Sequence, residues 1–186
     1  MKRLFDLFSS VTLTIALIIP MILIAILTKL TSRGPIIFWS DRVGINNKVF
    51  QMPKFRTMII ETPSVASHLL KNPSSYLSPI GGFLRSSSLD ELPQLISVLR
   101  GDMSIVGPRP ALFNQDNLIA LRSEKGVDKL LPGITGWAQV NGRDKLTISD
   151  KVKLDEEYLH HQSFRFDMII LRMTFLKVIK RIGVNH

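Results

Sequence analysis

One segment near the start of the chain limits what the protein can fold into, because residues 7–27 contain no charged side chain. As a straight helix these 21 residues would extend about 31 Å at ~1.5 Å per residue, close to the ~30 Å hydrocarbon core of a bilayer. The small-residue cleavage site that ends a secretory signal is not found after the run. The sequence therefore predicts a membrane segment that stays on the mature protein.

Two arrangements of this membrane segment are compatible with its residues. Basic side chains flank it on both sides: Lys2, Arg3, Lys29 and Arg33. The positive-inside rule is best satisfied if both ends face the cytoplasm. Pro20, preceded by Ile19, removes a backbone donor in the middle of the run and predicts a bend. A re-entrant helix is favoured on these grounds, but a kinked spanning helix is also compatible, since membrane helices tolerate proline.

The remaining segments carry local patterns of strands, helices and loops. Residues 35–60 alternate β-branched and aromatic residues around a Gly-Ile-Asn-Asn turn, which predicts a hairpin followed by an extended KFRTM segment. We expect helices at about 90–100 and 114–125, a loop at 61–82 that has room for a short helix, and a loop at 132–143 with an Asn141-Gly142 turn.

The end of the chain predicts an amphipathic helix, capped by Asp167. Its apolar stripe consists of Ile169, Ile170, Met173, Leu176 and Ile179. Basic residues lie between the apolar ones, so the helix suits a membrane surface, with its apolar side in the acyl boundary. Packing on the protein core is an equally good interpretation of the same pattern.

The charge of the chain restricts its partners. The formal net charge is +9 and the sequence pI is near 10.1, which indicates a polyanionic partner such as nucleic acid, anionic lipid or a phosphorylated small molecule. The basic residues are scattered among turns and follow no aromatic-lined reader motif, so we expect no nucleic acid partner. Without cysteine, the chain has no thiolate nucleophile and no disulfide.

Residues 84–110, LRSSSLDELPQLISVLRGDMSIVGPRP, contain the densest cluster of candidate chemistry, centred on Asp90 and Glu91. Ser88 and Glu91 have the spacing of a capping box, but a helix capped at Ser88 would hold Pro93 one turn inside. A helix capped at Asp90 avoids this problem. Both carboxylates would then lie at the positive end of a helix, which keeps aspartate ionised and favours phosphate. One carboxylate could attack while the other holds a metal.

Five cations next to turns or rigid backbone are candidate phosphate ligands: Lys54, Arg56, Arg85, Arg109 and Arg143. Each of them alone could be a solvated surface cation. Arg109 is the strongest candidate, because prolines on both sides present its guanidinium from a stiff loop. A pyrophosphate substrate with Mg²⁺ requires this mixture of carboxylates and cations. Trp137 and Phe83 could stack on a base, although a place in the core is the preferred interpretation.

Together these motifs resemble the small monotopic phosphoglycosyl transferases, the bacterial sugar transferase family. The resemblance covers nearly the whole chain, through KRLFD (2–6), the apolar run with Pro20, KFRTM (54–58), LRSSSLDELPQL (84–95), LRGDMSIVGPRP (99–110) and PGITGWAQVNGR (132–143). It implies a re-entrant membrane helix in residues 1–33 and a compact catalytic domain at the cytoplasmic face in residues 34–186. We expect an α/β fold, mostly α with one small sheet and amphipathic interfacial helices. Family members commonly have serine where this chain has Ile19.

The resemblance also implies an activity. The expected reaction transfers a sugar phosphate from a UDP-sugar to undecaprenyl phosphate with Mg²⁺, at the bilayer of the bacterial inner membrane, as the first membrane step of glycoconjugate synthesis. Asp90 matches the family nucleophile, Glu91 its partner near the metal, and Arg109 the phosphate-binding position. A homodimer is possible. The competing hypothesis is a non-enzymatic basic adaptor anchored by a spanning helix, which leaves Asp90 and Glu91 without a role.

Overall fold

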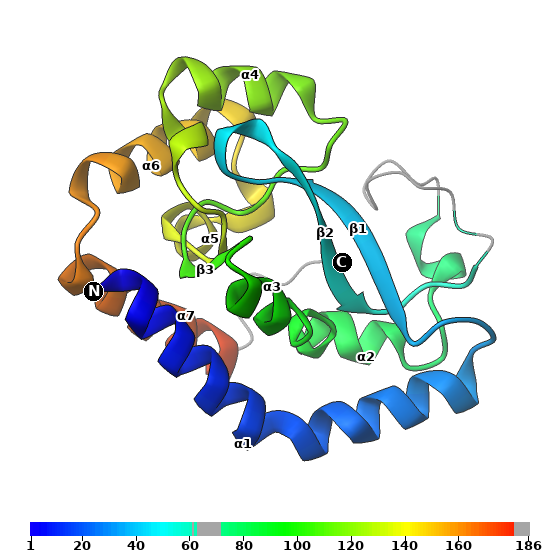
Figure 1. The fold of residues 1–186 in the computed structure, drawn as a ribbon. Coiled ribbons are helices and arrows are strands. Elements are labelled where there is room, and N and C mark those ends of the chain that lie inside the picture. The colour runs from blue at the N-terminus through cyan, green and yellow to red at the C-terminus, as the bar shows by residue number, and fades with distance from the viewer. Residues whose placement is uncertain (61, 63–71, 181–186) are drawn as a thin grey trace.

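The computed structural model describes residues 1–60, 62 and 72–180, and this part is mostly helical with two small sheets (Figure 1). The helices are α1 (Lys2–Thr31), α2 (Gly81–Ser86), α3 (Gln94–Arg100), α4 (Asp116–Glu124), α5 (Trp137–Asn141), α6 (Ile148–His161) and α7 (Phe164–Lys180). The strands are β1 (Ile37–Val43), β2 (Val49–Phe55), β3 (Ser104–Val106) and β4 (Gly133–Thr135). The mostly helical character predicted from the sequence is confirmed.

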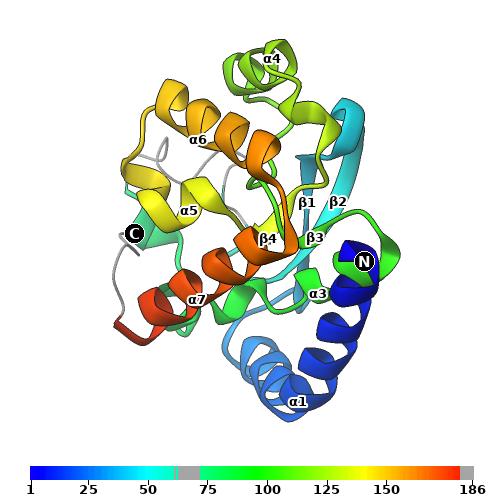
Figure 2. The same ribbon diagram turned by 90° about the vertical axis from the view of Figure 1, so that its left-hand side faces the viewer.

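Helix α1 runs without interruption through Pro20 and bends in its middle (Figure 1, Figure 2). Its first arm packs against α3 and β3, and its second arm reaches β2. Residues around the bend are exposed, with Ile19 at 68% of its full exposure. Among the described residues, α1 is the helix long and apolar enough to cross a membrane. The predicted bend is present, and both arms contact the same globular body.

The first arm of α1 is fixed to this body by polar contacts. Arg3 donates hydrogen bonds of 2.6 and 2.9 Å to two backbone carbonyls at the end of α3. The buried carboxylate of Asp6 accepts from the Ser104 hydroxyl at 2.9 Å and from the backbone N–H of Ile105 at 3.0 Å. Buried polar groups need such partners, so these bonds fix the start of α1 against β3.

The prediction that Asp167 caps the last helix is wrong. The Ser163 hydroxyl accepts from the backbone N–H of Phe166 at 3.2 Å, as an N-cap side chain does. Asp167 is buried instead, where its carboxylate accepts from the Tyr158 hydroxyl and pairs with the Lys2 ammonium, both at 2.6 Å. Both Lys2 and Arg3, expected to flank the membrane segment, thus bind the globular body.

The apolar stripe predicted on the last helix is divided between two sides of α7. Ile170 is fully buried in the core, and Met173 is half-buried beside it. Ile169 and Leu176 are both 45% exposed. The side chain of Ile179 lies outside the described residues. One side of α7 therefore packs on the core, and another apolar side is exposed to solvent. Core packing and membrane-surface binding each remain an interpretation of one side of this helix.

The predicted hairpin is confirmed. Strands β1 and β2 pair antiparallel, with Ile37 opposite Phe55 and Val43 opposite Val49, around a turn at residues 44–48. The isolated bridge between Met58 and Leu77 lies beyond the hairpin.

Two predicted loops contain short regular elements. Residues 132–143 include β4, which pairs parallel with β3, and helix α5. A single sheet was expected, so the second one corrects the prediction. Residues 61–82 overlap the start of α2 and include a 3₁₀ turn at Pro73–Tyr76, with residues 61 and 63–71 outside the described part. Elements of three to six residues are too short to show a hydrophobic period.

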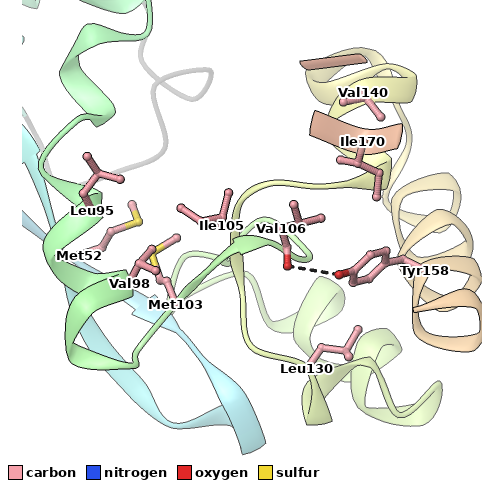
Figure 3. Close-up of a cluster of buried hydrophobic side chains, with 10 residues drawn as sticks. All are labelled: Met52, Leu95, Val98, Met103, Ile105, Val106, Leu130, Val140, Tyr158 and Ile170. Carbon is pink, nitrogen blue, oxygen red and sulfur yellow. Dashed lines mark hydrogen bonds between the residues drawn. The ribbon is translucent and has the colours of Figure 1, made fainter. Parts of the chain in front are cut away.

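Strand β3 lies at the centre of the main core (Figure 3). Ile105 and Val106 pack there between residues of the hairpin and α3 on one side and residues of α5, α6 and α7 on the other. The Tyr158 hydroxyl donates to the Val106 carbonyl at 3.3 Å. The chain leaves this core directly into the GPRP segment, residues 107–110, so the core positions that segment.

Glycines allow β3 and β4 to approach closely at the start of the GPRP segment. The first carbon of a side chain at Gly107 would collide with the Leu131 carbonyl oxygen, and that of a side chain at Gly133 would collide with the Gly107 nitrogen. Two hydrogen bonds of 2.8 Å form where the strands approach, from Gly107 N–H to the Thr135 carbonyl and from Gly133 N–H to the Pro108 carbonyl. The GPRP and PGITG motifs are therefore in direct contact.

Candidate active site

Asp90 and Glu91 lie in a 3₁₀ turn, Leu89–Glu91, between α2 and α3. The prediction of a helix that begins at Asp90 is wrong, because α3 begins at Gln94 with Pro93 at its N-cap and no side-chain cap bond. The capping box at Ser88 is also absent: Ser88 has a left-handed backbone (φ 57°) and makes no cap bond. Proline lacks an N–H and fits the N-cap position, so the two carboxylates precede the helix.

Three cations from distant parts of the chain converge on Glu91. Its Oε1 atom lies 2.8 Å from Arg109 Nη2, 3.2 Å from Lys54 Nζ and 4.0 Å from Arg143 Nη2. Lys54 comes from β2, Arg109 from the GPRP segment and Arg143 from the turn after α5. The structure thus brings together three of the five cations selected from the sequence.

These cations determine the charge of Glu91. Burial alone would raise the pKa of this carboxyl, but Arg109 and Lys54 together hold the pKa well below its usual range. Burial also lowers the pKa of the Lys54 ammonium, and Glu91 opposes that change. Glu91 is therefore an ionised anchor for cations at neutral pH.

Asp90 has a different environment from its neighbour. Its side chain is buried, and burial raises the pKa of the carboxyl above its ordinary value. Lys54 opposes this rise, Glu91 adds to it, and Arg85 and Arg109 also oppose it. The expectation that a helix start keeps Asp90 ionised is corrected, since no helix begins there. Neighbouring cations supply the stabilisation of its charged form.

The remaining two selected cations lie in different places. Arg85, in α2, donates from Nε to the Thr57 hydroxyl at 2.9 Å and acts electrostatically on Asp90. Arg56 is buried, and its Nη2 donates to the Ser32 carbonyl at 2.8 Å, just after α1. Arg56 was expected at the phosphate site, but its side chain binds the end of α1 because it turns back from β2 towards that helix.

Sequence reasoning missed Arg42, which belongs to the same site. Its Nη1 donates to the Pro110 carbonyl at 3.2 Å. Burial lowers the pKa of its guanidinium to about 10, with a further reduction by Arg109 and an opposing effect of Glu91. In the hairpin, Lys54 of β2 lies opposite Phe38 of β1. Arg42 follows Phe38 by four residues, and side chains alternate between the two faces, so Arg42 and Lys54 are on the same face. That register was the signal that could have identified it.

The two aromatic candidates behave differently. The Trp137 ring packs against Phe166 with centroids 4.9 Å apart, and its Nε1 donates to Glu157 at 2.9 Å. The preferred interpretation of Trp137 as a packing residue is confirmed. Phe83 is 63% exposed, so its assignment to the core is wrong. It lies in α2, two residues before Arg85.

Asp90 and Glu91 could serve as Mg²⁺ ligands only together with ligands from a substrate. Within the described ranges, no group of three His, Asp or Glu side chains could form a metal site. Mg²⁺ is commonly bound by one or two carboxylates together with substrate phosphates. Asp90 and Glu91 fit this mode, whereas a cage made only of protein ligands does not.

The chain matches a known protein family and several curated proteins. The Bacterial sugar transferase family matches residues 1–181. The chain is 38% identical to an uncharacterized sugar transferase, EpsL, of Bacillus subtilis, across 100% of this chain and 91% of that protein.

Two further relatives carry more specific names. The chain is 40% identical to the undecaprenyl-phosphate glucose phosphotransferase of Komagataeibacter xylinus, over 96% of this chain and 36% of that protein. It is 41% identical to the UDP-glucose:undecaprenyl-phosphate glucose-1-phosphate transferase of Escherichia coli, over 89% of this chain and 38% of that protein. The chain thus spans little more than a third of these two relatives.

The chain combines a helix long and apolar enough to cross a membrane with a carboxylate site that is rich in cations. The family match covers almost the whole chain and includes every residue of that site. The chain belongs to the bacterial sugar transferase family.

Proposed function

We propose that this protein transfers a sugar phosphate from a UDP-sugar to undecaprenyl phosphate and releases UMP. The observation that carries the proposal is the convergence of Lys54, Arg109 and Arg143 on Glu91, directly beside Asp90. Cations in excess over carboxylates, on partly buried side chains, suit a pyrophosphate. The names of the relatives from Komagataeibacter xylinus and Escherichia coli support the substrates.

In the first step a carboxylate oxygen of Asp90 attacks the β-phosphorus of the UDP-sugar. The bond between this phosphorus and the oxygen that bridges to the α-phosphate breaks, and UMP leaves with the electron pair. The product is an acyl phosphate that links the Asp90 carboxyl to the sugar phosphate. Arg109, Lys54 and Arg143 are placed to balance the charge on the leaving phosphate. Glu91 is already paired with cations, so the nucleophile is assigned to Asp90.

In the second step a phosphate oxygen of undecaprenyl phosphate attacks the same phosphorus. The bond to Asp90 breaks, which restores the carboxylate and gives the polyprenyl diphosphosugar. The two substrates use the site in turn, so a soluble donor and a lipid acceptor need not be bound together.

Mg²⁺ would be held by Asp90 and Glu91 with substrate phosphates. When bound, it would polarise phosphoryl oxygens and offset their negative charge. The protein side chains still provide the orientation, because Arg109 and Lys54 are positioned on Glu91 by hydrogen bonds of 2.8 and 3.2 Å.

The membrane arrangement is part of the proposal. Both arms of α1 contact one body, and the apolar residues near its bend, such as Ile15 and Ile19, are exposed. This suits a re-entrant helix that enters and leaves the inner membrane at the cytoplasmic face. The exposed apolar side of α7, with Phe175 at 66%, suits the membrane surface. The phosphate of the lipid acceptor would then lie at the same level, relative to the membrane surface, as Asp90.

A UMP-release assay tests the reaction class. Purified protein is supplied with Mg²⁺, undecaprenyl phosphate and each member of a UDP-sugar panel. We expect release of UMP with at least one donor, and a phosphosugar adduct on the wild-type protein when the acceptor is omitted. Asp90→Asn should lose turnover by at least about 10³-fold and form no adduct. Appreciable turnover by this variant would refute the nucleophile, and inactivity with every donor would favour the adaptor hypothesis.

A further inference from the structure

Four consecutive backbone carbonyls, those of residues 108–111 in and just after the GPRP segment, are held by other parts of the chain. Pro108 accepts from the N–H of Gly133 at 2.8 Å, and Pro110 from Nη1 of Arg42 at 3.2 Å. The carbonyl of residue 111 accepts from the N–H of Val43 at 3.0 Å. The two prolines have no N–H, so carbonyl acceptors provide most of the hydrogen bonds that can fix this segment.

The fourth carbonyl, that of Arg109, is held by a largely buried arginine in α4. Arg122 Nη1 donates to the Arg109 carbonyl at 2.8 Å. The other side of the same guanidinium, Nε and Nη2, donates to Asp155 Oδ2 at 3.0 and 2.6 Å. The Asp155 side chain is 1% exposed and that of Arg122 is 11% exposed. One planar group therefore joins α6 to the backbone of Arg109.

The geometry assigns a positioning role to Arg122, which sets the backbone of Arg109 so that its guanidinium reaches Glu91 and the donor phosphates. Asp155 holds Arg122 in the required orientation. This inference rests on the proposed function, because it concerns how the phosphate-binding arginine is presented. The side-chain hydrogen bonds and ion pairs of Arg122 and Asp155 within the described residues go to each other and to the Arg109 carbonyl, so the polar link from α6 to the site runs through the backbone of Arg109.

Lysine cannot replace arginine in this role. The ammonium group is a single point, whereas the guanidinium has donors on two sides and spans two partners. Arg122→Lys keeps a positive charge beside Asp155 but gives up the fork that reaches both Asp155 and the Arg109 carbonyl. The variant therefore separates positioning of Arg109 from neutralisation of the buried carboxylate.

The structure offers a matched control on the same two helices. Lys125 at the end of α4 pairs with Glu156 of α6 at 3.2 Å, and the two side chains are 51% and 28% exposed. This pair also links α4 to α6, but it does not contact the GPRP segment in the described structure. Lys125→Gln should leave the kinetics unchanged.

A double-mutant cycle tests the assignment. We expect Arg122→Lys to lower kcat/KM for the UDP-sugar by about 10- to 100-fold, because small displacements of a positioning group have effects of that size. In an Arg109→Ala background the same substitution should change kcat/KM by less than about 3-fold. An equal loss in both backgrounds would show that Arg122 does not act through Arg109 and would overturn the inference.

A second measurement does not depend on turnover. Hydrogen exchange at the amides of Val43, Gly107 and Gly133, whose hydrogen bonds join residues 107–111 to neighbouring segments, should accelerate in Arg122→Lys and not in Lys125→Gln. Unchanged exchange in Arg122→Lys would overturn the positioning role. A wild-type protein that releases no UMP would refute the proposed function, while the exchange comparison would still decide how the Arg109 backbone is held.

Discussion

Two regions of the molecule contain pairs of largely buried carboxylates, and they are built differently. At the start of α1, Asp6 is bound by a hydroxyl and a backbone N–H, and Asp167 by a tyrosine and Lys2. At the candidate active site, Asp90 and Glu91 are surrounded by more cations than there are carboxylates: Lys54, Arg85, Arg109 and Arg143. In the first region the carboxylates are matched by donors, whereas the second carries excess positive charge.

This difference separates a structural role from a chemical one. Matched partners hold an element in place and leave no excess of positive charge for an anionic ligand. Excess positive charge is unfavourable in the free protein and becomes favourable when a phosphorylated substrate binds. Substitution of Asp6 or Asp167 should therefore change stability, and substitution of residues at the candidate active site should mainly change activity.

After the loss expected for Asp90→Asn, the largest effect is expected for Arg109→Ala. Removal of a charge-assisted donor from a developing phosphate charge should lower kcat/KM for the UDP-sugar by about 10²–10³-fold. The thermal midpoint should change little, because the guanidinium is partly exposed and its loss reduces repulsion with Lys54 and Arg143. Kinetics and a thermal melt of the same preparation measure both quantities. A variant with normal kinetics would remove Arg109 from the phosphate site.

The opposite pattern is expected for Asp6→Ala. The Ser104 hydroxyl and the Ile105 N–H would lose their shared acceptor in a buried place, which costs about 2–4 kcal/mol. At about 2–4 °C per kcal/mol for a chain of this size, the thermal midpoint should fall clearly. At temperatures where the variant is folded, kcat/KM should remain within a few-fold of the wild type. Activity lost without a change in the midpoint would contradict the comparison.

A smaller effect concerns pH. In the proposed mechanism the ionised form of Asp90 is the nucleophile, so kcat/KM should fall as pH drops through the pKa of Asp90, which burial places above the ordinary value. Lys54 lowers this pKa, and Lys54→Met should therefore move the acidic limb of the profile to higher pH. Glu91, Arg85 and Arg109 also face Asp90 and stay in place. The position of the limb is the measured quantity, and a shift to lower pH would contradict the assignment.

The smallest effect is expected for Glu156→Gln. The pair with Lys125 is exposed, and such pairs contribute about 0–1 kcal/mol. The thermal midpoint and kcat/KM should both remain close to those of the wild type. This variant is the baseline for the others, and a large loss would show that contacts between α4 and α6 matter in general.

The sequence predicted those features that depend on local chemistry. Pro20 indicated the bend of α1, alternation indicated the hairpin, and prolines around Arg109 indicated a fixed presentation. The sequence could not predict that Arg56 binds the Ser32 carbonyl. The two residues are 24 positions apart, and only the tertiary fold determines how close they lie. The start of α3 was misplaced for a similar reason. The left-handed backbone at Ser88 inserts a turn that residue preferences do not reveal.

The glycine contact between β3 and β4 restricts how this chain could exchange parts with a relative. Gly107 of the GPRP segment and Gly133 of the PGITG motif meet with no room for a methyl group between them. A chimera that takes only one of the two motifs from a relative would combine two backbone segments that do not come from the same protein. Such a hybrid should displace Arg109 even if every residue of the site were kept, whereas exchange of both motifs as a unit should preserve it.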